Sequence, residues 1–429
     1  MVLTEVHQVR QGHKLYKFLD ELSCKSKSIY NMANYLIRQE FIRTSKLKEE
    51  GLLEHAAWLR WMELDKLLKG FYKETYSLLP AKSVQLILKN LDESWNSFFG
   101  SIRKWKSDKS KFKGRPRLPK YKDKVAGRNV VLLNNQQFKV KDGIVYFLYS
   151  LTKDLNFKPI KTKIPEEAKL IQITISPRRG YYNFNIVYDL PSLSLKATEG
   201  LERKTGVHKD LNLKDCMAID IGINNFCTVS NTVDKDFFII NGRSLKSVNQ
   251  WANKFQAYSS VSQKRKNKVW RKRENKLSYF FHKTSNFLIE KALSKGCKSL
   301  VVGYNQEWKQ NVNLGRKTNQ SFVQIPYHKF LFILDYKCNL ANIELVKLNE
   351  AYTSKCSFID MEPIGSHEIY KGRRVFRGLF RSLKGILINA DLNGSLNILR
   401  KYLGTKFQLE TPDQVEDFVV SPYRVSFSC

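Results

Sequence analysis

The sequence contains few cysteines, and none of them form a recognisable pair motif. The seven cysteines among 429 residues stand at positions 24, 216, 227, 297, 338, 356 and 429. No two of them have the Cys-x-x-Cys spacing that zinc ribbons and thiol redox sites use. This scatter favours reduced, packed thiols in an intracellular protein and predicts no disulfide framework.

Long hydrophobic runs are also missing. No stretch reaches about 18 apolar residues, the length that a membrane-spanning helix needs. Residues 1–6 lack the apolar segment of a secretory signal. Apolar residues still make up 42% of the chain, enough to build a core, and this length accommodates two or three domains. We therefore expect a multidomain globular protein without a membrane partner.

Acidic residues are scarce relative to basic ones. There are 40 Asp and Glu against 74 Lys and Arg, and the formal net charge is +34. An excess of this size is larger than solubility requires and indicates a polyanionic partner. Because the chain has no membrane-spanning run, nucleic acid is the polyanion that we expect.

Hydrophobic residues three and four positions apart predict three helices in the first quarter of the chain. The helices cover about residues 14–43, about residues 53–68 and a stretch that begins at Pro80, a residue suited to a first helical turn. A short strand is expected before them, at residues 1–10. The aromatic residues of the third helix, among them Trp95, are expected in a core.

A strongly basic segment follows at residues 103–124. Eleven of its residues are Lys or Arg, and three aromatic residues lie between them. Pro116 and Pro119 exclude a regular helix. Such an extended strip can contact a nucleic-acid backbone and stack on bases, although a plain solvated loop has the same composition. We favour nucleic-acid binding, with Lys113, Arg115, Arg117 and Lys120 as candidate contacts.

Two hairpins are predicted after this strip. Residues 138–140 and 144–147 flank the turn at 141–143, and residues 171–175 and 182–187 flank the turn at 177–180. Glycine in each turn supports this interpretation. The strands predict a small β-barrel or sheet, and the polar, irregular residues 191–214 are expected to form a linker.

The second half of the chain has a different order of elements. Strands are predicted near residues 217–221, 225–230 and 236–240, followed by a long helical region at about 245–293. Further strands at 299–302 and 343–348 alternate with helices, which is the order of an RNase H fold.

One part of the long helical region is densely charged. Residues 264–273 contain seven basic side chains in ten. Charges at this density repel one another along a helix unless phosphates neutralise them. The candidate contacts here are Lys264, Arg265, Lys266, Arg271, Lys272 and Arg273.

Two aspartates are candidates for metal binding. Asp220 stands in the apolar strand 217–221, where a carboxylate is unfavourable unless a cation or hydrogen bonds compensate. Asp391 opens a predicted helix that has Leu392, Leu396 and Leu399 on one face. Each has an ordinary explanation as well, a turn cap for Asp220 and a helix N-cap for Asp391.

The order of these acids and their neighbouring motifs resembles the TnpB family. Tyr352-Thr353-Ser354-Lys355-Cys356 and Asn389-Ala390-Asp391-Leu392-Asn393-Gly394 carry the resemblance together with Asp220, and the basic strip has a similar place in the family. These are transposon-encoded nucleases of the RuvC type, related to Fanzor proteins and type V CRISPR effectors. The resemblance covers most of the chain.

The resemblance implies an α/β, multidomain protein. An RNase H-like RuvC nuclease domain is expected at residues 196–429, with a basic target-binding insertion at about 356–388. A β-barrel wedge domain is expected at residues 1–12 and 122–195, interrupted by a helical recognition lobe at residues 13–121.

The chain departs from the family at the second acidic position. The strand at 299–302 ends at Gly303, where most RuvC-type nucleases have a glutamate. Glu350 follows the adjacent strand and matches the displaced glutamate of Fanzor proteins and some TnpB relatives. A side chain of this length can span one strand spacing of ~4.8 Å. Glu307, in a predicted loop, is the weaker candidate.

The family often carries a zinc ribbon between the Thr-Ser-Lys motif and the last acid. Here that interval offers only Cys356 and His367 as ligands, whereas structural zinc takes four. We expect no zinc. The interval is basic instead, with Phe376 and Phe380 among cations that suit contact with a target strand: Arg373, Arg374, Arg377, Arg381 and Lys384.

The resemblance also implies an activity. It predicts an RNA-guided DNA endonuclease in which Asp220, Glu350 and Asp391 hold two Mg²⁺ ions, with Mn²⁺ as a substitute. The implied partners are a guide RNA from the protein's own locus and double-stranded target DNA, and we expect a monomer. The alternatives are a nuclease-dead, RNA-guided repressor, which Gly303 favours, and a DNA-strand transferase, for which we find no His-hydrophobe-His motif. The compartment would be the cytoplasm and nucleoid of a prokaryote or the nucleus of a eukaryote.

Overall fold

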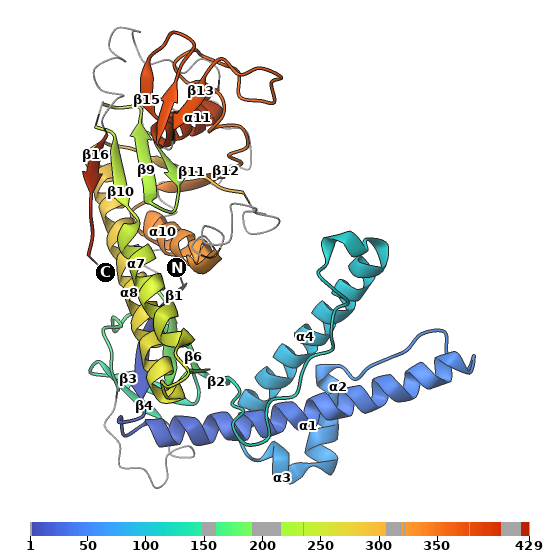
Figure 1. Cartoon of the computed structure of the whole chain (residues 1–429). Helices are drawn as coiled ribbons and strands as arrows, with labels where there is room; N and C mark the ends of the chain where they lie inside the picture. The colour runs from blue at the N-terminus through green and yellow to red at the C-terminus, as the bar shows by residue number, and fades with distance from the viewer. Residues whose placement is uncertain are drawn as a thin grey trace. The chain divides into compact units, whose positions relative to one another are not determined.

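The structure is a computed structural model of the chain. It describes residues 2–147, 160–190, 216–234, 236–305, 320, 323–376, 378–404 and 422–428. The chain divides into two compact units, Met1–Leu195 and Lys196–Cys429, whose elements are labelled in Figure 1. The predicted linker at 191–214, Glu307 and Arg377 lie outside the described residues.

The strands of the first unit form two antiparallel sheets where the sequence predicted a barrel or sheet. The larger has the order β1-β7-β6-β2 and the smaller the order β3-β4-β5. Their bounds are β1 Val2–Arg10, β2 Val131–Asn134, β3 Phe138–Lys141, β4 Ile144–Phe147, β5 Ile160–Lys161, β6 Lys169–Arg178 and β7 Tyr181–Asp189. Asp142 and Gly143 both have positive φ at the β3–β4 turn, as a tight two-residue hairpin requires.

The helices of the first unit are α1 (Tyr16–Glu49), α2 (Trp61–Phe71), α3 (Lys73–Tyr76) and α4 (Ala81–Ser107), with a 3₁₀ turn at Lys109–Lys111. Helix α2 begins later than predicted because the Glu63 carboxylate accepts the N–H of Arg60 at 2.7 Å and caps the first turn there. Trp95 of α4 is fully buried, as expected for a core aromatic, and its indole N–H donates to Asn34 Oδ1 of α1 at 3.0 Å.

The second unit is built on a six-stranded mixed sheet of order β12-β11-β8-β9-β10-β16. The bounds are β8 Cys216–Ile221, β9 Asn225–Asn231, β10 Phe238–Asn241, β11 Ser299–Gly303, β12 Glu344–Leu348 and β16 Tyr423–Val425. Strands β8, β9 and β10 are antiparallel, whereas β11 and β12 run parallel to β8. The first five strands confirm the predicted RNase H-like order, and β16, parallel to β10, extends the sheet.

Helices cover both faces of this sheet. Met217 and Ile219 of β8 pack with α8 (Gln263–Ser294) and α10 (Tyr327–Leu340), whereas Cys216 and Ala218 pack with α11 (Ala390–Leu403). The alternation follows from the two-residue period of a strand. A three-stranded antiparallel sheet leads into α11: β13 Arg373–Phe376, β14 Leu379–Arg381 and β15 Leu387–Asn389.

The long helical region predicted at about 245–293 is two helices, α7 (Arg243–Ala257) and α8. The chain becomes extended at Tyr258, and the Ser262 hydroxyl accepts the N–H of Arg265 to cap α8. Serine residues in the break favour such local side-chain bonds over helix continuation.

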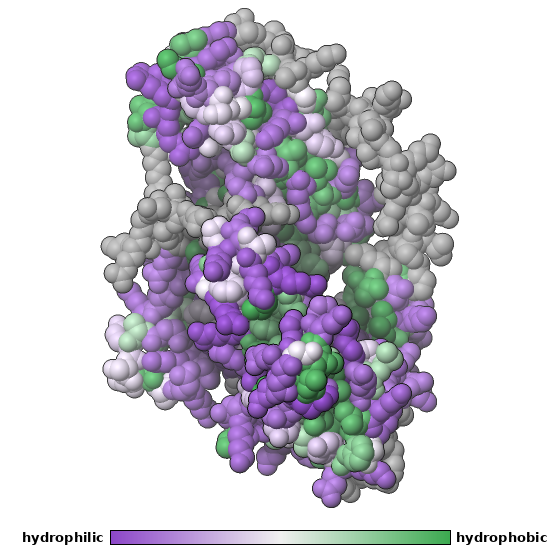
Figure 2. All heavy atoms as spheres, turned by 90° about the vertical axis from the view of Figure 1, so that its right-hand side faces the viewer, coloured by the Kyte–Doolittle hydropathy of each residue, from purple (hydrophilic) through white to green (hydrophobic). Residues whose placement is uncertain are grey.

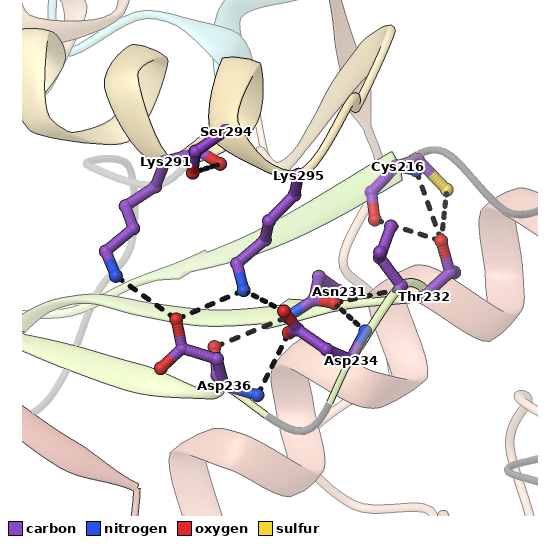
Figure 3. A network of polar contacts seen from close by, with 9 residues as sticks. Cys216, Asn231, Thr232, Asp234, Asp236, Lys291, Ser294 and Lys295 are labelled. Atoms are coloured by element: carbon purple, nitrogen blue, oxygen red, sulfur yellow. Dashed lines mark hydrogen bonds and ion pairs between the residues drawn. The ribbon is translucent and has the colours of Figure 1, made fainter.

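An ion-pair network joins the end of α8 to the connection between β9 and β10 (Figure 3). Lys295 pairs with Asp234 and, at 3.1 Å, with Asp236, which also pairs with Lys291 at 3.1 Å. Asn231 accepts the N–H of Asp234 at 2.8 Å. These contacts lie at the end of β8 and β9 away from Asp220, since Met217 pairs with Asn231 and Asp220 with Thr228.

Among the described residues, no helix is long and apolar enough to cross a membrane. The face in Figure 2 carries mainly hydrophilic residues, with hydrophobic residues gathered in smaller patches. A hydrophilic surface fits the net charge of +34.

Candidate active site

The strand alternation places Asp220 on the α11 face of the sheet. Cys216 and Ala218, four and two residues earlier in β8, pack against α11, so Asp220 points to the same side. Gly303 ends β11 on this side too, because Val301 packs with the α11 residues and Leu300 and Val302 with the opposite face. Both predicted positions therefore face the helix that Asp391 begins.

Asp391 is held at the first turn of α11 by two side-chain amides. Asn389 is the N-cap, and its side chain accepts the N–H groups of Asp391 and Leu392 at 3.0 and 3.1 Å. The N-cap role considered for Asp391 therefore belongs to Asn389, and the Asp391 carboxylate is available for another role. Its Oδ2 accepts the Nδ2–H of Asn225, the first residue of β9, at 2.6 Å.

Helix α11 lies close to β8 at Gly394. A Cβ atom added at Gly394 would lie 2.8 Å from Asp220 Oδ2. Ser395, the next residue, donates to the carbonyl of Ala218 at 3.0 Å and fixes the helix at that distance. The glycine therefore keeps open the space that the Asp220 carboxylate occupies.

Glu350 occupies the space left by the missing side chain at Gly303. A Cβ atom at Gly303 would lie 3.0 Å from Glu350 Oε2, 3.3 Å from Glu350 Cβ and 2.6 Å from Ile398 Cδ1. Strand β12 pairs in parallel with β11 through Gly303 and Leu348, and Glu350 follows two residues later. The Glu350 carbonyl accepts the N–H and hydroxyl of Thr353, at 3.1 and 2.8 Å, which ties it to the Thr-Ser-Lys motif.

The other two carboxylates act electrostatically on Asp220. Burial, followed by repulsion from Glu350 and then from Asp391, raises the pKa of Asp220 well above its ordinary value, while the charge of Arg374 acts in the opposite direction. Like charges that lie close together are the expected surroundings of a cation site.

The chemistry of the three carboxylates suits divalent cations. Carboxylate oxygens are the ligands that Mg²⁺ and Mn²⁺ prefer, and the glycines at 303 and 394 leave room for two of the three. In the part of the chain that the structure describes, however, no three His, Cys, Asp or Glu side chains are arranged closely enough to hold a metal ion as they stand. The donor set fits in chemistry, and the carboxylates would have to draw together to fit in geometry.

The basic strip after α4 lies along α1 and is held by its backbone. Carbonyls of the strip accept side-chain donors of α1: Asn31 and Lys27 donate to residues 122 and 124 at 2.9 and 2.7 Å, and Asn34 donates to Pro119 at 3.1 Å. The candidate contacts Lys113, Arg115, Arg117 and Lys120 are all exposed. This arrangement leaves their cations available to phosphates.

One predicted nucleic-acid contact on α8 is contradicted by the structure. Arg273 is buried, and it donates to Asn249 Oδ1 of α7 and to the carbonyl of Gln324, both at 2.7 Å. It therefore joins elements inside the unit. Of the other candidates on α8, Lys264, Arg265 and Lys272 are exposed, and Lys266 and Arg271 are half-buried.

The basic insertion before α11 is divided between surface and core. Arg373, Arg374 and Arg381 are exposed, and so is Phe376. Phe380, which the sequence predicts on this surface, is instead buried in a cluster with Phe358 and residues of α11. Phe380 is therefore a core residue of the small sheet and does not belong to its surface.

Hydrogen bonds close the loop at residues 357–371, which lies in the interval where we expect no zinc. Glu362 is buried, and its carboxylate accepts the N–H groups of Ser357 and Lys371 at 2.7 and 2.8 Å, which joins the two ends of the loop. His367 contacts the carbonyl of Pro363 at 2.7 Å, and the Cys356 thiol donates to the carbonyl of Gly365. Whether zinc is absent stays a prediction.

Sequence reasoning missed two residues of the site, Asn225 and Gly394. A glycine within a helix costs stability, and this cost is a sign of a close approach that the motif could have revealed. No pattern in the sequence pointed to Asn225, because its contact with Asp391 joins residues far apart in the chain.

The fold and the three carboxylates define the class of the second unit. It is an RNase H-like domain with acidic residues on one face of its sheet. Two family models match within it, OrfB_IS605, described as "Probable transposase", over residues 201–309, and "Cas12f1-like, TNB domain" over residues 327–398. The TnpB-like protein ORF457 of Acidianus two-tailed virus is 21% identical over 425 residues, covering 92% of this chain and 84% of the relative.

Solved structures show a more distant likeness. A Cas12f1–sgRNA–target DNA complex has a TM-score of 0.36 at 13% identity, covering 93% of this chain and all of the Cas12f1 chain. The mini-RNA-guided endonuclease CRISPR-Cas_phi3 has a TM-score of 0.43 at 10% identity, covering 96% of this chain and 94% of that one. The two family models and the viral relative support the resemblance of this chain to the TnpB family.

Proposed function

We propose that this protein is an RNA-guided DNA endonuclease whose site is completed by a displaced glutamate. The observation that carries the proposal is the position of Glu350, whose carboxylate lies in the space that a side chain at Gly303 would take. The chain thus supplies a third acid from Glu350, although it has Gly303 where the family pattern has a glutamate. Similarity to the TnpB family and the charge of +34 support a nucleic-acid substrate.

In this proposal Asp220, Glu350 and Asp391 hold divalent cations. Bound Mg²⁺ would supply a water nucleophile and stabilise the leaving oxygen of a DNA phosphodiester. Gly394 and Gly303 give two of the carboxylates their positions, and Asn225 orients the third.

The basic surfaces would bind the nucleic acids through their phosphates. Base pairing between a guide RNA from the protein's own locus and one DNA strand would supply sequence specificity, as in other RNA-guided effectors. The exposed strip at 113–120 and the exposed arginines of β13 and β14 are candidate contacts.

The nuclease-dead alternative rests on Gly303. A protein that had lost cleavage would have no need to keep a glycine within a helix to make room for a carboxylate. This chain has such a glycine, Gly394, which faces Asp220. The arrangement therefore favours an active nuclease over a repressor.

The direct test is purification of the full chain from cells that carry its locus, with sequencing of the bound RNA. We expect one structured RNA from that locus, and cleavage in Mg²⁺ of DNA that matches a guide segment of that RNA. A protein that elutes without RNA and binds no locus RNA at low salt would refute the guided model. A complex that binds matched DNA but does not cut it in Mg²⁺ or Mn²⁺ would support the repressor.

A further inference from the structure

The C-terminal residues return to the sheet after α11 and place the Arg424 side chain next to the active site. Residues 422–428 include strand β16, which pairs with the outer edge of β10 through Phe238–Tyr423, Ile239–Arg424 and Ile240–Val425. Figure 1 shows this strand beside β10. The Arg424 guanidinium donates to Asn225 Oδ1 at 3.1 Å.

The segment around Arg424 is anchored by aromatic packing. The Tyr423 ring lies 5.6 Å from the Phe238 ring, and the Phe427 ring lies 6.1 and 5.7 Å from those of Phe280 and Phe287 on α8. Ser426 also accepts a hydrogen bond from Asn241 Nδ2 at 3.3 Å. The ring contacts and the pairing with β10 fix β16, so the position of Arg424 is part of the fold, whereas the exposed Ser426 bond contributes little.

Asn225 connects Arg424 to the third carboxylate. Its Oδ1 faces Arg424 and its Nδ2 donates to Asp391 Oδ2 at 2.6 Å. A guanidinium has only donors and an ionised carboxylate has only acceptors, so both contacts are satisfied in a single orientation of the amide. If the amide turned by 180°, its oxygen would face the carboxylate and its NH₂ would face the cation.

The backbone of Asn225 is fixed as well. It follows the tight β8–β9 turn, in which the Gly222 N–H donates to the Phe226 carbonyl at 3.2 Å. The N–H of Gly242, the N-cap of α7, donates to the Asn224 carbonyl of this turn at 2.7 Å. A Cβ at Gly222 would lie 2.5 Å from the Asn225 carbonyl oxygen. The turn therefore brings the Asn225 side chain to Asp391 with little freedom.

We propose that Arg424 and Asn225 are positioning residues of the active site: Arg424 sets the orientation of the Asn225 amide, which in turn holds one oxygen of Asp391 and leaves the other for a cation. The inference rests on the proposed function, since it concerns the same carboxylates. It adds the C-terminal strand to the apparatus that prepares the metal site.

The test uses full-length protein freed of nucleic acid, with Mn²⁺ as the probe and free Mn²⁺ measured by electron paramagnetic resonance. Loss of a group that orients a metal ligand typically weakens metal affinity 10–100-fold, and we expect that range for Asn225→Ala. Arg424→Ala removes one exposed hydrogen bond, and we expect a loss of about 3- to 10-fold. Arg424→Lys, which keeps a donor, should recover part of it.

The double variant separates positioning from independent action. If Arg424 acts through Asn225, the Asn225→Ala/Arg424→Ala protein should bind Mn²⁺ as Asn225→Ala does. Ser426→Ala is the matched control, because it removes a hydrogen bond of the same segment to Asn241 and should leave Mn²⁺ affinity unchanged. Arg424 is exposed, so its variant should fold even if that of Asn225 does not.

Three outcomes would overturn the proposal: unchanged affinity in Arg424→Ala, additive losses in the double variant, or a wild-type chain that binds no Mn²⁺. Guided cleavage is then measured against Mn²⁺ concentration, and the half-saturating concentration should rise in the variants more than the maximal rate falls. Wild-type protein that binds Mn²⁺ with the expected variant pattern but never cleaves would refute the nuclease function and leave the positioning role supported.

Discussion

Gly394 offers a test in which helix propensity and site geometry predict opposite results. In an ordinary helix interior, Gly→Ala stabilises a protein by about 0.5–1 kcal/mol. At Gly394 the added methyl would lie 2.8 Å from Asp220 Oδ2, closer than such atoms can approach. Either the carboxylate turns away or α11 shifts, and overpacking of this kind costs about 1–3 kcal/mol.

The expected result for Gly394→Ala is a folded protein with little gain or a net loss in unfolding free energy and a cleavage rate at least about 10-fold lower, because misplacement of a catalytic group by a fraction of an ångström has effects of this size. Gly100→Ala is the matched control, since Gly100 lies within α4 and its added Cβ would meet nothing within 4 Å. The control should be slightly stabilised and fully active.

The assays are chemical denaturation for stability and single-turnover cleavage of guided DNA for activity. Binding of guide RNA should be unchanged in both variants, because neither glycine belongs to a basic surface. If Gly394→Ala cleaves at the wild-type rate, the Asp220 carboxylate does not act from the position described here and the reasoning is wrong.

Three further predictions concern other parts of the second unit. Gly303→Ala should lower the cleavage rate, and it should lower stability by about 1–3 kcal/mol. Adding Ile398→Val removes the 2.6 Å contact with Ile398 Cδ1 but leaves the contact with Glu350. The double variant should therefore recover more of its stability than of its cleavage rate. Lys295→Met should destabilise the protein by about 1–3 kcal/mol in denaturation at neutral pH. The pKa of each partner, Asp234 and Asp236, is lowered in the folded protein. The stability from the pairing is therefore present above the ordinary pKa of 3.8 and is lost as the pH falls through the lower folded-state pKa. Below that pH the wild-type protein and the variant should have the same stability. Elemental analysis should find no stoichiometric zinc, and one zinc per chain would contradict the account of the Glu362 loop.

Much of the second unit could be predicted from the sequence because its signals are local. The apolar strands and their order, the acid within β8 and the acid at the start of α11 each depend on a few neighbouring residues. Glu350 could be proposed from its place after β12. The position of its carboxylate over Gly303 required the register between two strands, which the sequence does not contain.

The rest depended on contacts between distant residues. Strand β16 is only three residues long and forms by pairing with the outer edge of β10. A segment this short has no hydrophobic periodicity that could predict it. Arg273 stands in a run of cations, and the packing of α8 on α7 decides that it points inward. The break at Tyr258 reflects a serine cap rather than a proline or glycine, and hydrophobic spacing alone could not locate it.

The central claim is that Glu350 is the third carboxylate of a nuclease site with Asp220 and Asp391. It is tested most directly by cleavage of guided DNA in Mg²⁺ with Glu350→Gln, alongside Asp220→Ala, Asp391→Ala and the control Glu307→Gln, while binding of the same DNA is measured in parallel. The account predicts that the first three variants bind guided DNA but do not cut it, and that Glu307→Gln keeps most of its activity. A Glu350→Gln protein that still cuts, together with a Glu307→Gln protein that does not, would contradict it.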